Sequence, residues 1–375
     1  MQSFTHWHPT RVIFSRGVLN ELGKVSEGLG KRALIVTGRT FAIKYGYLDL
    51  MRRLLGEKGI EAHVFPQVEP NPTLGTVKKC VEEAEKASVD FFVAFGGGSA
   101  IDVAKAANVV YTLGGSVEDY LYPKTVEASL RPLIAIPTTH GTGSEVTRYS
   151  VLVDERTRMK VTVSGSALYP TVALMDPQVL EHLPRDQAAA TGLDALSHAV
   201  EAFFGKRANP FSDMLALEAA RIILENLPCA VEGVLDCREW MLYASMLAGY
   251  AINFTGTNVG HGLGYPLTTR LNLPHGLANA MILPGAALYY EALVPGRARR
   301  FMGGLGLDYY PGSLRELLER VKQAVGAPAR LRDLGVRREE LGEYIEDALR
   351  YQRNLQNAPF NVERDHVARI FEEVY

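Results

Sequence analysis

Cysteine is scarce in this chain and lacks the spacing that would give it a structural role. Only three of the 375 residues are cysteine, Cys80, Cys229 and Cys237, and no two of them form a Cys-x-x-Cys pair. An odd and scattered set predicts neither a disulfide framework nor a thiolate metal site. We therefore expect the protein to work in a reducing compartment.

The chain has no surplus of either charge, and we expect no targeting segment. Its 40 lysines and arginines nearly balance 42 aspartates and glutamates, for a net charge of -2. No basic surplus points to a nucleic-acid partner. The first ten residues, MQSFTHWHPT, contain neither the basic region nor the apolar run of a signal peptide. A cytoplasmic protein is the expectation.

One long uncharged stretch, residues 240–269, raises the question of a membrane span. It contains no Asp, Glu, Lys or Arg, and it exceeds the roughly 20 residues that a spanning helix needs. However, Asn253, Thr257 and His261 within it would be left without partners in lipid. We expect a buried helix followed by a loop that lines a site, and no membrane partner.

Length and the pattern of apolar segments predict two domains. A chain of 375 residues exceeds the size at which single hydrophobic cores stop growing. In the first half, short apolar strands alternate with helical stretches, which predicts a parallel sheet covered by helices on both faces. The expected strands are residues 33–37, 62–65, 91–95 and 133–136, with a hairpin of 149–153 and 160–164 beside the sheet.

Beyond Pro177 the strand pattern ends and helical periodicity takes over. Residues 212–227, for example, repeat apolar side chains at the spacing of one helix face. The predicted fold class is therefore α/β plus all-α. A Rossmann-like parallel-sheet domain is expected over 1–183, followed by an all-helical domain over 184–375.

A glycine-rich turn follows the expected strand that ends at Phe95. Without Cβ atoms, Gly97 and Gly98 let the backbone approach a pyrophosphate, and the first N–H groups of the next helix point at it. Ser99 and Asp102 also form a Ser-x-x-Asp pair, so helix capping is the alternative interpretation. The turn departs from the G-x-G-x-x-G fingerprint, yet it has more glycines than a cap needs. We expect these four residues to contact a nucleotide.

A second polar loop, residues 137–145, follows the next expected strand. It adds Thr138, Thr139 and Thr142 at the carboxyl edge of the sheet, where open α/β sheets bind their ligands. The alternative is a polar turn into the hairpin. Both loops together favour a nucleotide site.

The residues after the first expected strand bear on the choice of nucleotide. An acidic residue there would hold the ribose hydroxyls of NAD, but this chain has Gly38 and Arg39. Glycine makes room and arginine pairs with a 2′-phosphate, so NADP(H) is favoured over NAD(H). A surface arginine without a ligand is the alternative.

Four polar side chains in the helical half are candidate metal ligands. Asp194 and His198 are four residues apart, on one helix face, and His261 and His275 each stand in a glycine-rich, uncharged segment. Each histidine alone is more typical of a satisfied core group. One carboxylate with three imidazoles is an N3O set suited to Fe²⁺ or Zn²⁺, whereas Mg²⁺ or Ca²⁺ would call for more oxygen ligands.

His140 is the other histidine of interest, because it lies in the second polar loop. It is a candidate to line the reaction pocket, although contact with backbone is the commoner outcome for a loop histidine.

With these residues in view, the chain resembles the iron-containing alcohol dehydrogenase family over nearly its whole length. The resemblance rests on four blocks, GGGSAIDVAKA, PTTHGTGSEVT, ATGLDALSHAVEAF and HGLGYPLTTRLNLPHGLANA. It implies a dinucleotide-binding domain followed by a metal-binding domain, and a homodimer. It implies metal ligation by Asp194, His198, His261 and His275, and cofactor contacts from Gly97, Gly98, Ser99, Thr138, Thr139, Thr142 and Lys160.

Two departures from the family pattern matter. Gly38 and Arg39 replace the usual acidic residue, and Tyr265 stands where many members have a histidine that relays protons. Tyr265 is a candidate relay, but shaping the pocket or packing is the favoured interpretation. No catalytic residue beyond the metal site is therefore predicted, apart from the candidates Tyr265 and His140.

The resemblance implies an NAD(P)-dependent alcohol dehydrogenase or aldehyde reductase that acts on a small primary alcohol or aldehyde. The ion would hold the substrate oxygen while hydride passes to nicotinamide. One alternative is a lyase of the dehydroquinate synthase type, although no basic cluster marks a phosphorylated substrate. The other is a metal- and nucleotide-binding protein without chemistry, for which Tyr265 is the best support.

Overall fold

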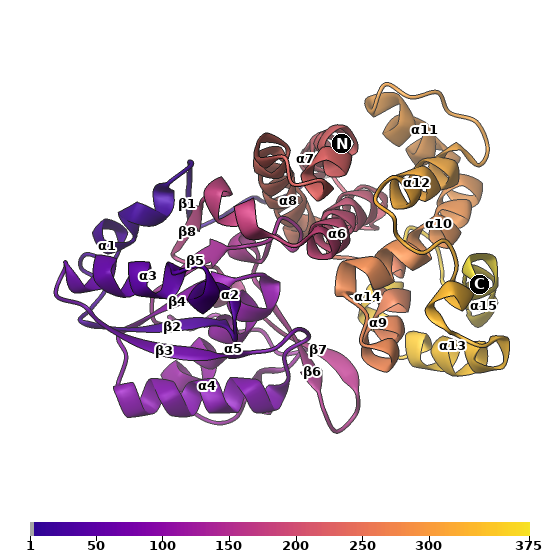
Figure 1. Ribbon diagram of the computed structural model, residues 1–375. Coiled ribbons are helices and arrows are strands. Elements are labelled where there is room, and N and C mark those ends of the chain that lie inside the picture. The colour runs from indigo at the N-terminus through magenta and orange to yellow at the C-terminus, as the bar shows by residue number, and fades with distance from the viewer. Residues whose placement is uncertain (1–3) are drawn as a thin grey trace. The chain divides into compact units, whose positions relative to one another are not determined.

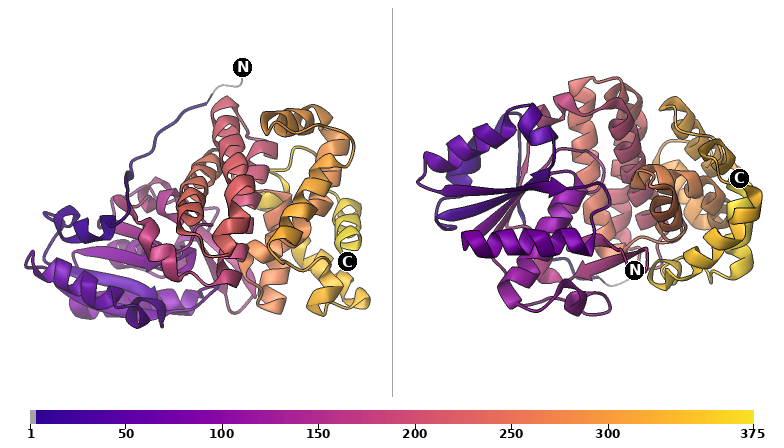
Figure 2. Two further views of the ribbon diagram at one scale, coloured as in Figure 1. Left: turned by 45° about the horizontal axis from the view of Figure 1, so that its top comes forward. Right: turned by 60° about the horizontal axis from the view of Figure 1, so that its bottom comes forward.

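The computed structural model describes residues 4–375, which divide into two compact units (Figures 1 and 2). The α/β unit comprises His6–Thr139 and Ser144–His182. The helical unit comprises Leu183–Tyr375 together with Phe4, Thr5 and the short segment His140–Gly143. The second polar loop is therefore shared between the two units.

The α/β unit is built on a six-stranded sheet in the order β1-β8-β5-β4-β2-β3, in which every pair of neighbours is parallel. Four of these strands are the expected ones, while β1 and β8 are two short additional strands at one edge. The strands are β1 (Arg11–Phe14), β2 (Arg32–Gly38), β3 (Glu61–Val68), β4 (Phe91–Gly96), β5 (Leu133–Pro137) and β8 (Val172–Met175).

Helices cover both faces of this sheet (Figure 1). Alternate residues of each strand point to opposite faces, so Phe92 and Ala94 of β4 join one core while Phe91, Val93 and Phe95 join the other. On the first side lie α4 (Leu74–Ala87) and α5 (Gly98–Leu113), and on the second α1 (Leu22–Val25), α2 (Phe41–Lys44) and α3 (Tyr47–Gly56). The expected parallel sheet, buried on both faces, is confirmed.

The expected hairpin forms a separate two-stranded antiparallel sheet, β6 (Tyr149–Asp154) with β7 (Met159–Ser164). A buried lysine of α5, Lys105, anchors the chain just before it. Its Nζ donates to the carbonyl oxygens of Ser144 and Thr147 at 2.7 Å and of Tyr149 at 2.9 Å. Burial lowers the pKa of Lys105 to about 8. The three carbonyl oxygens replace the water that this ammonium group loses.

The helical unit contains no β-strand within its described residues, as the sequence predicts. Helix α6 packs against α7, α8 and α10, and α10 also packs against α9, α12 and α15. The helices are α6 (Arg185–Phe204), α7 (Pro210–Val231), α8 (Leu235–Thr255), α9 (Val259–Leu271), α10 (His275–Leu293), α11 (Pro295–Gly304), α12 (Ser313–Ala324), α13 (Leu341–Leu349), α14 (Gln352–Leu355) and α15 (Arg364–Val374).

The glycine-rich segment around His261 is helical, so the expectation that a loop follows the buried helix there is wrong. Helix α9 begins after Asn258, whose side chain accepts a hydrogen bond from the Val259 N–H at 2.6 Å. Glycine disfavours a helix in isolation. Here a Cβ on Gly260 would stand 3.0 Å from the Glu201 carboxyl carbon, and one on Gly264 only 2.4 Å from Asn279 Oδ1. Close packing onto α6 and α10 therefore explains the glycines.

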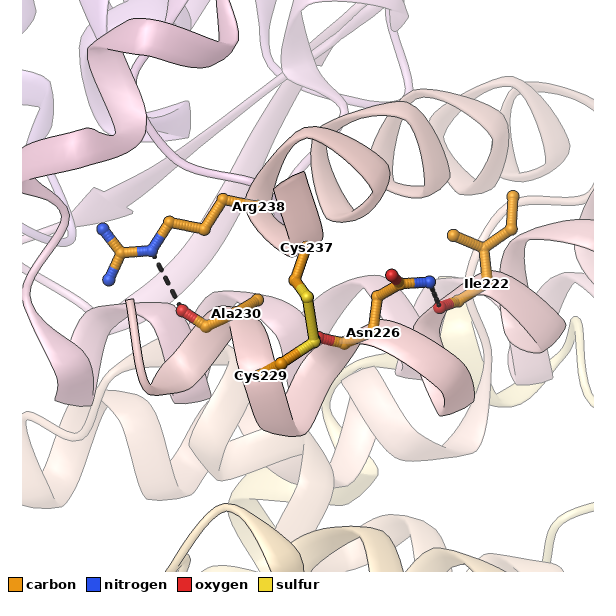
Figure 3. The surroundings of a disulfide bond; sticks show 6 residues. All are labelled: Ile222, Asn226, Cys229, Ala230, Cys237 and Arg238. Atoms are coloured by element: carbon orange, nitrogen blue, oxygen red, sulfur yellow. Dashed lines mark hydrogen bonds between the residues drawn. A yellow bond between two sulfur atoms is a disulfide. The ribbon is translucent and has the colours of Figure 1, made fainter. Parts of the chain in front are cut away.

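A disulfide joins Cys229 near the end of α7 to Cys237 near the start of α8 (Figure 3). The expectation that these cysteines stay unpaired is therefore wrong. The turn between the helices brings the two Cα atoms to 5.9 Å, within the range of natural disulfides. Next to it, Arg238 Nε donates to the Ala230 carbonyl at 2.9 Å and ties the turn a second time. Cys80 is a free, buried cysteine.

Within residues 4–375, no helix by itself has the length and apolar character that crossing a bilayer requires. The pair α10 and α11 meets the requirement only when the two are taken together, across a bend of 116°.

Candidate metal centre and nucleotide-binding edge

Three helices of the helical unit bring the four predicted metal ligands together. Asp194 and His198 lie on α6, His261 on α9, and His275 is the first residue of α10. Asp194, His261 and His275 each offer one ligand atom, and these atoms lie within 4.8 Å of one another. His198 Nε2 is 3.1 Å from His261 Nε2 and 4.0 Å from Asp194 Oδ1. Helix packing thus brings together Asp194 and His275, which are 81 residues apart in the sequence.

Glycine again decides how closely the ligand-bearing helices approach. A Cβ on Gly276 would stand 2.0 Å from the Ala190 carbonyl oxygen and 2.6 Å from Asp194 Cβ. Real Cβ atoms do not come this close, because such distances lie well inside van der Waals contact. Only glycine at this position lets the start of α10 rest on α6 beside Asp194.

Hydrogen bonds set the tautomers of two histidines. His198 Nδ1 lies 3.2 Å from the Gly141 carbonyl oxygen, and His261 Nδ1 contacts Glu201 Oε2. A carbonyl or an ionised carboxylate only accepts, so each Nδ1 carries the hydrogen. Each neutral ring therefore presents a lone pair at Nε2 to the centre of the cluster. This arrangement, in which a second group orients a metal-binding imidazole, is typical of protein metal sites.

Glu201 was not singled out from the sequence, although it belongs to the block around His198. Its side chain is fully buried and also accepts from the backbone N–H groups of Asn258 at 2.8 Å and His261 at 3.1 Å. Burial alone would raise the pKa of Glu201, but the His261 ring and these hydrogen bonds bring it below the ordinary value. A glutamate one turn after a candidate ligand, with no apolar role, was the available signal.

The cluster fits a divalent cation. The two lone pairs of His198 and His261 face each other across 3.1 Å, and the Asp194 carboxylate stands 3.9 Å from His261 Nε2. Such a set is repulsive until positive charge enters it, from a proton or a metal ion. Four convergent donors, three nitrogen and one oxygen, match Fe²⁺ or Zn²⁺ better than Mg²⁺ or Ca²⁺.

Tyr265 packs against the histidines. Its ring stacks on His275 with centroids 5.4 Å apart, and it meets His261 edge-on at 6.1 Å. Tyr265 is 8% exposed, and burial raises its pKa. A hydroxyl that holds its proton more tightly than usual is a poor proton relay at neutral pH.

His140 is fully buried in the helical unit. Its Nδ1 lies 3.5 Å from Thr191 Oγ1, and its Nε2 has no hydrogen-bond partner among residues 4–375. Burial lowers the pKa of His140 to about 4. The ring is therefore neutral at physiological pH.

The predicted nucleotide contacts gather at the carboxyl edge of the sheet. Gly38 ends β2, Gly97 and Gly98 follow β4, and Thr138 and Thr139 follow β5. Strand β2 leads to a neighbour on one side and β4 to a neighbour on the other, so the order reverses between them. Open α/β sheets bind ligands at such a switch point, outside the carboxyl ends of the strands.

The start of α5 has the character of a phosphate site. No side chain caps it, and its first turn contains no acidic residue, so its positive end is not neutralised locally. A Cβ on Gly97 would lie 3.1 Å from Thr139 Cγ2, which shows how closely the two polar loops meet. Arg39 is exposed just beyond β2.

Other predicted contacts are placed differently. Asp102 does not cap α5, so that interpretation is wrong: its carboxylate accepts from Ser144 Oγ at 2.5 Å and from the Val151 N–H at 2.8 Å. Lys160 Nζ donates to Asn71 Oδ1 at 2.8 Å, in the loop after β3. Thr142 belongs to the segment of the second loop that packs within the helical unit.

Comparison with known proteins agrees with both halves of this description. The family model described as iron-containing alcohol dehydrogenase matches residues 9–177. The model for the C-terminal part of the Fe-containing alcohol dehydrogenase family matches residues 188–375. The chain belongs to the iron-containing alcohol dehydrogenase family. The predicted resemblance is confirmed.

Relatives in this family match most or nearly all of the chain's length. It is 35% identical to the 1,3-propanediol dehydrogenase of Citrobacter freundii, over 99% of each chain. It is 33% identical to the NAD-dependent methanol dehydrogenase of Bacillus methanolicus (89% of this chain, 90% of the relative). It is 31% identical to the NADPH-dependent butanol dehydrogenase of Clostridium saccharobutylicum (98% and 97%). An iron-containing alcohol dehydrogenase from Thermotoga maritima has a similar crystal structure, with a TM-score of 0.89, 37% identity and 99% of each chain covered.

Proposed function

We propose that this protein is a metal-dependent alcohol dehydrogenase or aldehyde reductase for small primary alcohols or aldehydes. The observation that carries the proposal is the convergence of Asp194, His198, His261 and His275 in one cluster, in which His275 is partly exposed and the other three are buried. We take all four as ligands of Fe²⁺, with Zn²⁺ as the alternative. When bound, the ion supplies a Lewis acid that lowers the pKa of the substrate hydroxyl and favours hydride transfer to a nicotinamide ring.

The chain's own residues would prepare this site. Glu201 holds His261, and the Gly141 carbonyl holds His198, so both rings keep Nε2 free of hydrogen. Tyr265 covers the flat face of His275. We assign it to shaping the site and keeping water from it, and we propose no relay role for Tyr265 or His140.

We further propose that residues 1–183 bind the nucleotide and residues 184–375 the metal. The proposed contacts come from the end of β2, the glycine-rich turn after β4, the second polar loop and the hairpin. They are Gly38, Arg39, Gly97, Gly98, Ser99, Thr138, Thr139, Thr142 and Lys160. Asp102 is assigned to holding the hairpin instead of the nucleotide.

NADP(H) is the proposed nucleotide, in preference to NAD(H). The support is Arg39, an exposed cation after β2 beside Gly38, where a carboxylate would repel a 2′-phosphate. The relatives include enzymes described as NADPH-dependent and as NAD-dependent. We expect Arg39→Ser to lower kcat/KM with NADPH roughly tenfold, or about 1.4 kcal/mol, and to leave kcat/KM with NADH nearly unchanged.

The deciding experiment follows oxidation of NADPH and NADH with short aldehydes. The protein is stripped of metal and reloaded with Fe²⁺ or Zn²⁺ without oxygen, with His275→Ala as the control. The proposal is supported if one ion restores turnover in the wild type but not in His275→Ala. Binding of metal and nucleotide without turnover on any short aldehyde would contradict it. The homodimer implied by the resemblance stays a prediction, which light scattering checks.

A further inference from the structure

The side-chain amide of Asn279 contacts the ligand cluster. It lies one helical turn after His275 on α10, so the two side chains share a face. Its Nδ2 is 3.0 Å from Asp194 Oδ1, 3.1 Å from His261 Nε2 and 3.2 Å from His275 Nε2. Asn279 thus contacts three of the four proposed ligands.

Chemistry defines which end of the amide faces Asp194. An ionised carboxylate only accepts hydrogen bonds, so the group 3.0 Å from Asp194 Oδ1 must be the donating NH₂. The opposite orientation would set two oxygen atoms with partial or full negative charge against each other. Asn279 Oδ1, on the far side, has no hydrogen-bond partner within residues 4–375.

Close packing fixes the position of this amide. Asn279 is fully buried. Gly264 of α9 lies so close that a Cβ there would come within 2.4 Å of Asn279 Oδ1 and 3.1 Å of its Cα. A buried carbonyl oxygen without a partner costs about 1–3 kcal/mol. The contact between its Nδ2 and Asp194 Oδ1, and not a partner of its Oδ1, therefore holds the amide in this orientation.

We propose that Asn279 is a positioning residue that sets which metal ions the cluster accepts. Its N–H group donates a hydrogen bond to Asp194 Oδ1, so that this carboxylate oxygen is shared with the amide. The set of metal ligands therefore stays poor in oxygen atoms. Fe²⁺ and Zn²⁺ accept a nitrogen-rich set, whereas Mn²⁺ and Mg²⁺ favour more oxygen atoms. The inference rests on the metal-binding role proposed above for Asp194 and the three histidines.

The test compares metal affinities instead of activity. Asn279→Asp keeps the shape of the side chain but removes both N–H donors and adds an oxygen ligand beside Asp194. We expect the affinity for Mn²⁺ relative to Zn²⁺ to rise at least tenfold. Asn279→Ala should weaken Zn²⁺ and Fe²⁺ binding about 10–100-fold, as loss of a group that orients a ligand does elsewhere. Dissociation constants come from competition with a chelator, on the full chain, without oxygen for Fe²⁺.

Asn357 offers a matched control in the same unit. It is 8% exposed, and its Nδ2 donates to the Thr255 and Thr257 carbonyls at 2.7 and 3.0 Å. Asn357→Asp should cost stability but leave the Mn²⁺/Zn²⁺ preference unchanged.

Three results would overturn the inference. The first is an Asn279→Asp variant with the wild-type Mn²⁺/Zn²⁺ preference. The second, should that variant not fold, is an Asn279→Ala variant with wild-type Zn²⁺ affinity. The third is a wild-type chain that binds none of these ions, which would overturn the proposed metal site as well and so distinguishes the two failures.

Discussion

At the scale of single residues, surroundings decide what each histidine does. The Nδ1 atoms of His198 and His261 each contact a hydrogen-bond acceptor, and their Nε2 atoms face each other in the proposed metal site. His140 is equally buried but has only a 3.5 Å contact to Thr191 Oγ1. The same side chain is therefore a proposed metal ligand in two positions and a neutral core group in the third.

His140 should make stability depend on pH. Its folded pKa is about 4, below the ordinary value of 6.5, because burial disfavours the charged ring. The unfolded chain then binds more protons between these values, so stability is full above pH 6.5 and falls as pH drops toward 4. Between pH 7 and pH 5 we expect this histidine to cost about 2 kcal/mol. Urea unfolding of wild type and His140→Gln at both pH values measures the difference; equal pH dependence would contradict the assignment.

At the scale of secondary-structure elements, glycines permit the helix approaches that build the cluster. Gly276→Ala would force its Cβ against the Ala190 carbonyl at 2.0 Å. We expect a loss of about 1–3 kcal/mol in unfolding free energy and weaker metal binding, because α10 must move away from α6. Gly303→Ala on α11, where a new Cβ meets nothing within 4 Å, is the control and should be neutral or slightly stabilising. A wild-type stability for Gly276→Ala would contradict this account, because helix propensity alone favours alanine over glycine.

The disulfide between α7 and α8 stabilises by closing a short loop in the unfolded chain. With eight residues of separation, the loop-closure model gives roughly 2.6 kcal/mol. Cys229→Ser should lower the unfolding free energy by about 2–3 kcal/mol. A dithiol that reduces the disulfide of the wild type should lower its unfolding free energy by the same amount. Thiol titration of the denatured, unreduced wild type should find one free thiol, Cys80; finding three would show that the bond does not form in solution.

At the scale of the whole molecule, the proposed sites assign a different ligand to each of the two units. A metal ion that binds only the folded helical unit stabilises it by about 2.7 kcal/mol when its concentration is a hundred times Kd. Chelation should therefore lower the melting temperature of this unit, and His275→Ala should remove the response. Calorimetry with NADPH added alone should instead raise the transition of the α/β unit. One transition that is insensitive to chelator would contradict the proposed metal site.

Much of this protein was determined by local sequence alone. Apolar runs such as FFVAF mark strands buried on both faces, because only such strands lack polar residues over five positions. The glycines after β4 and the polar loop after β5 lie at strand ends, so their position in the sequence already places them at one edge. Asp194 and His198 share a helix face through their spacing of four. In each case the interaction is short-range along the chain.

Only the tertiary structure decided the remaining features, because they depend on contacts between distant segments. The glycines of α9 indicate a loop until the close approach of Glu201 and Asn279 is known. Cys229 and Cys237 pair because α7 and α8 fold back on each other. Asn279 carries no signal in isolation, since a buried amide acquires its role from the group it faces, and the role of Glu201 follows from its contact with His261. Sequence determined which residues were available, and packing decided which of them meet.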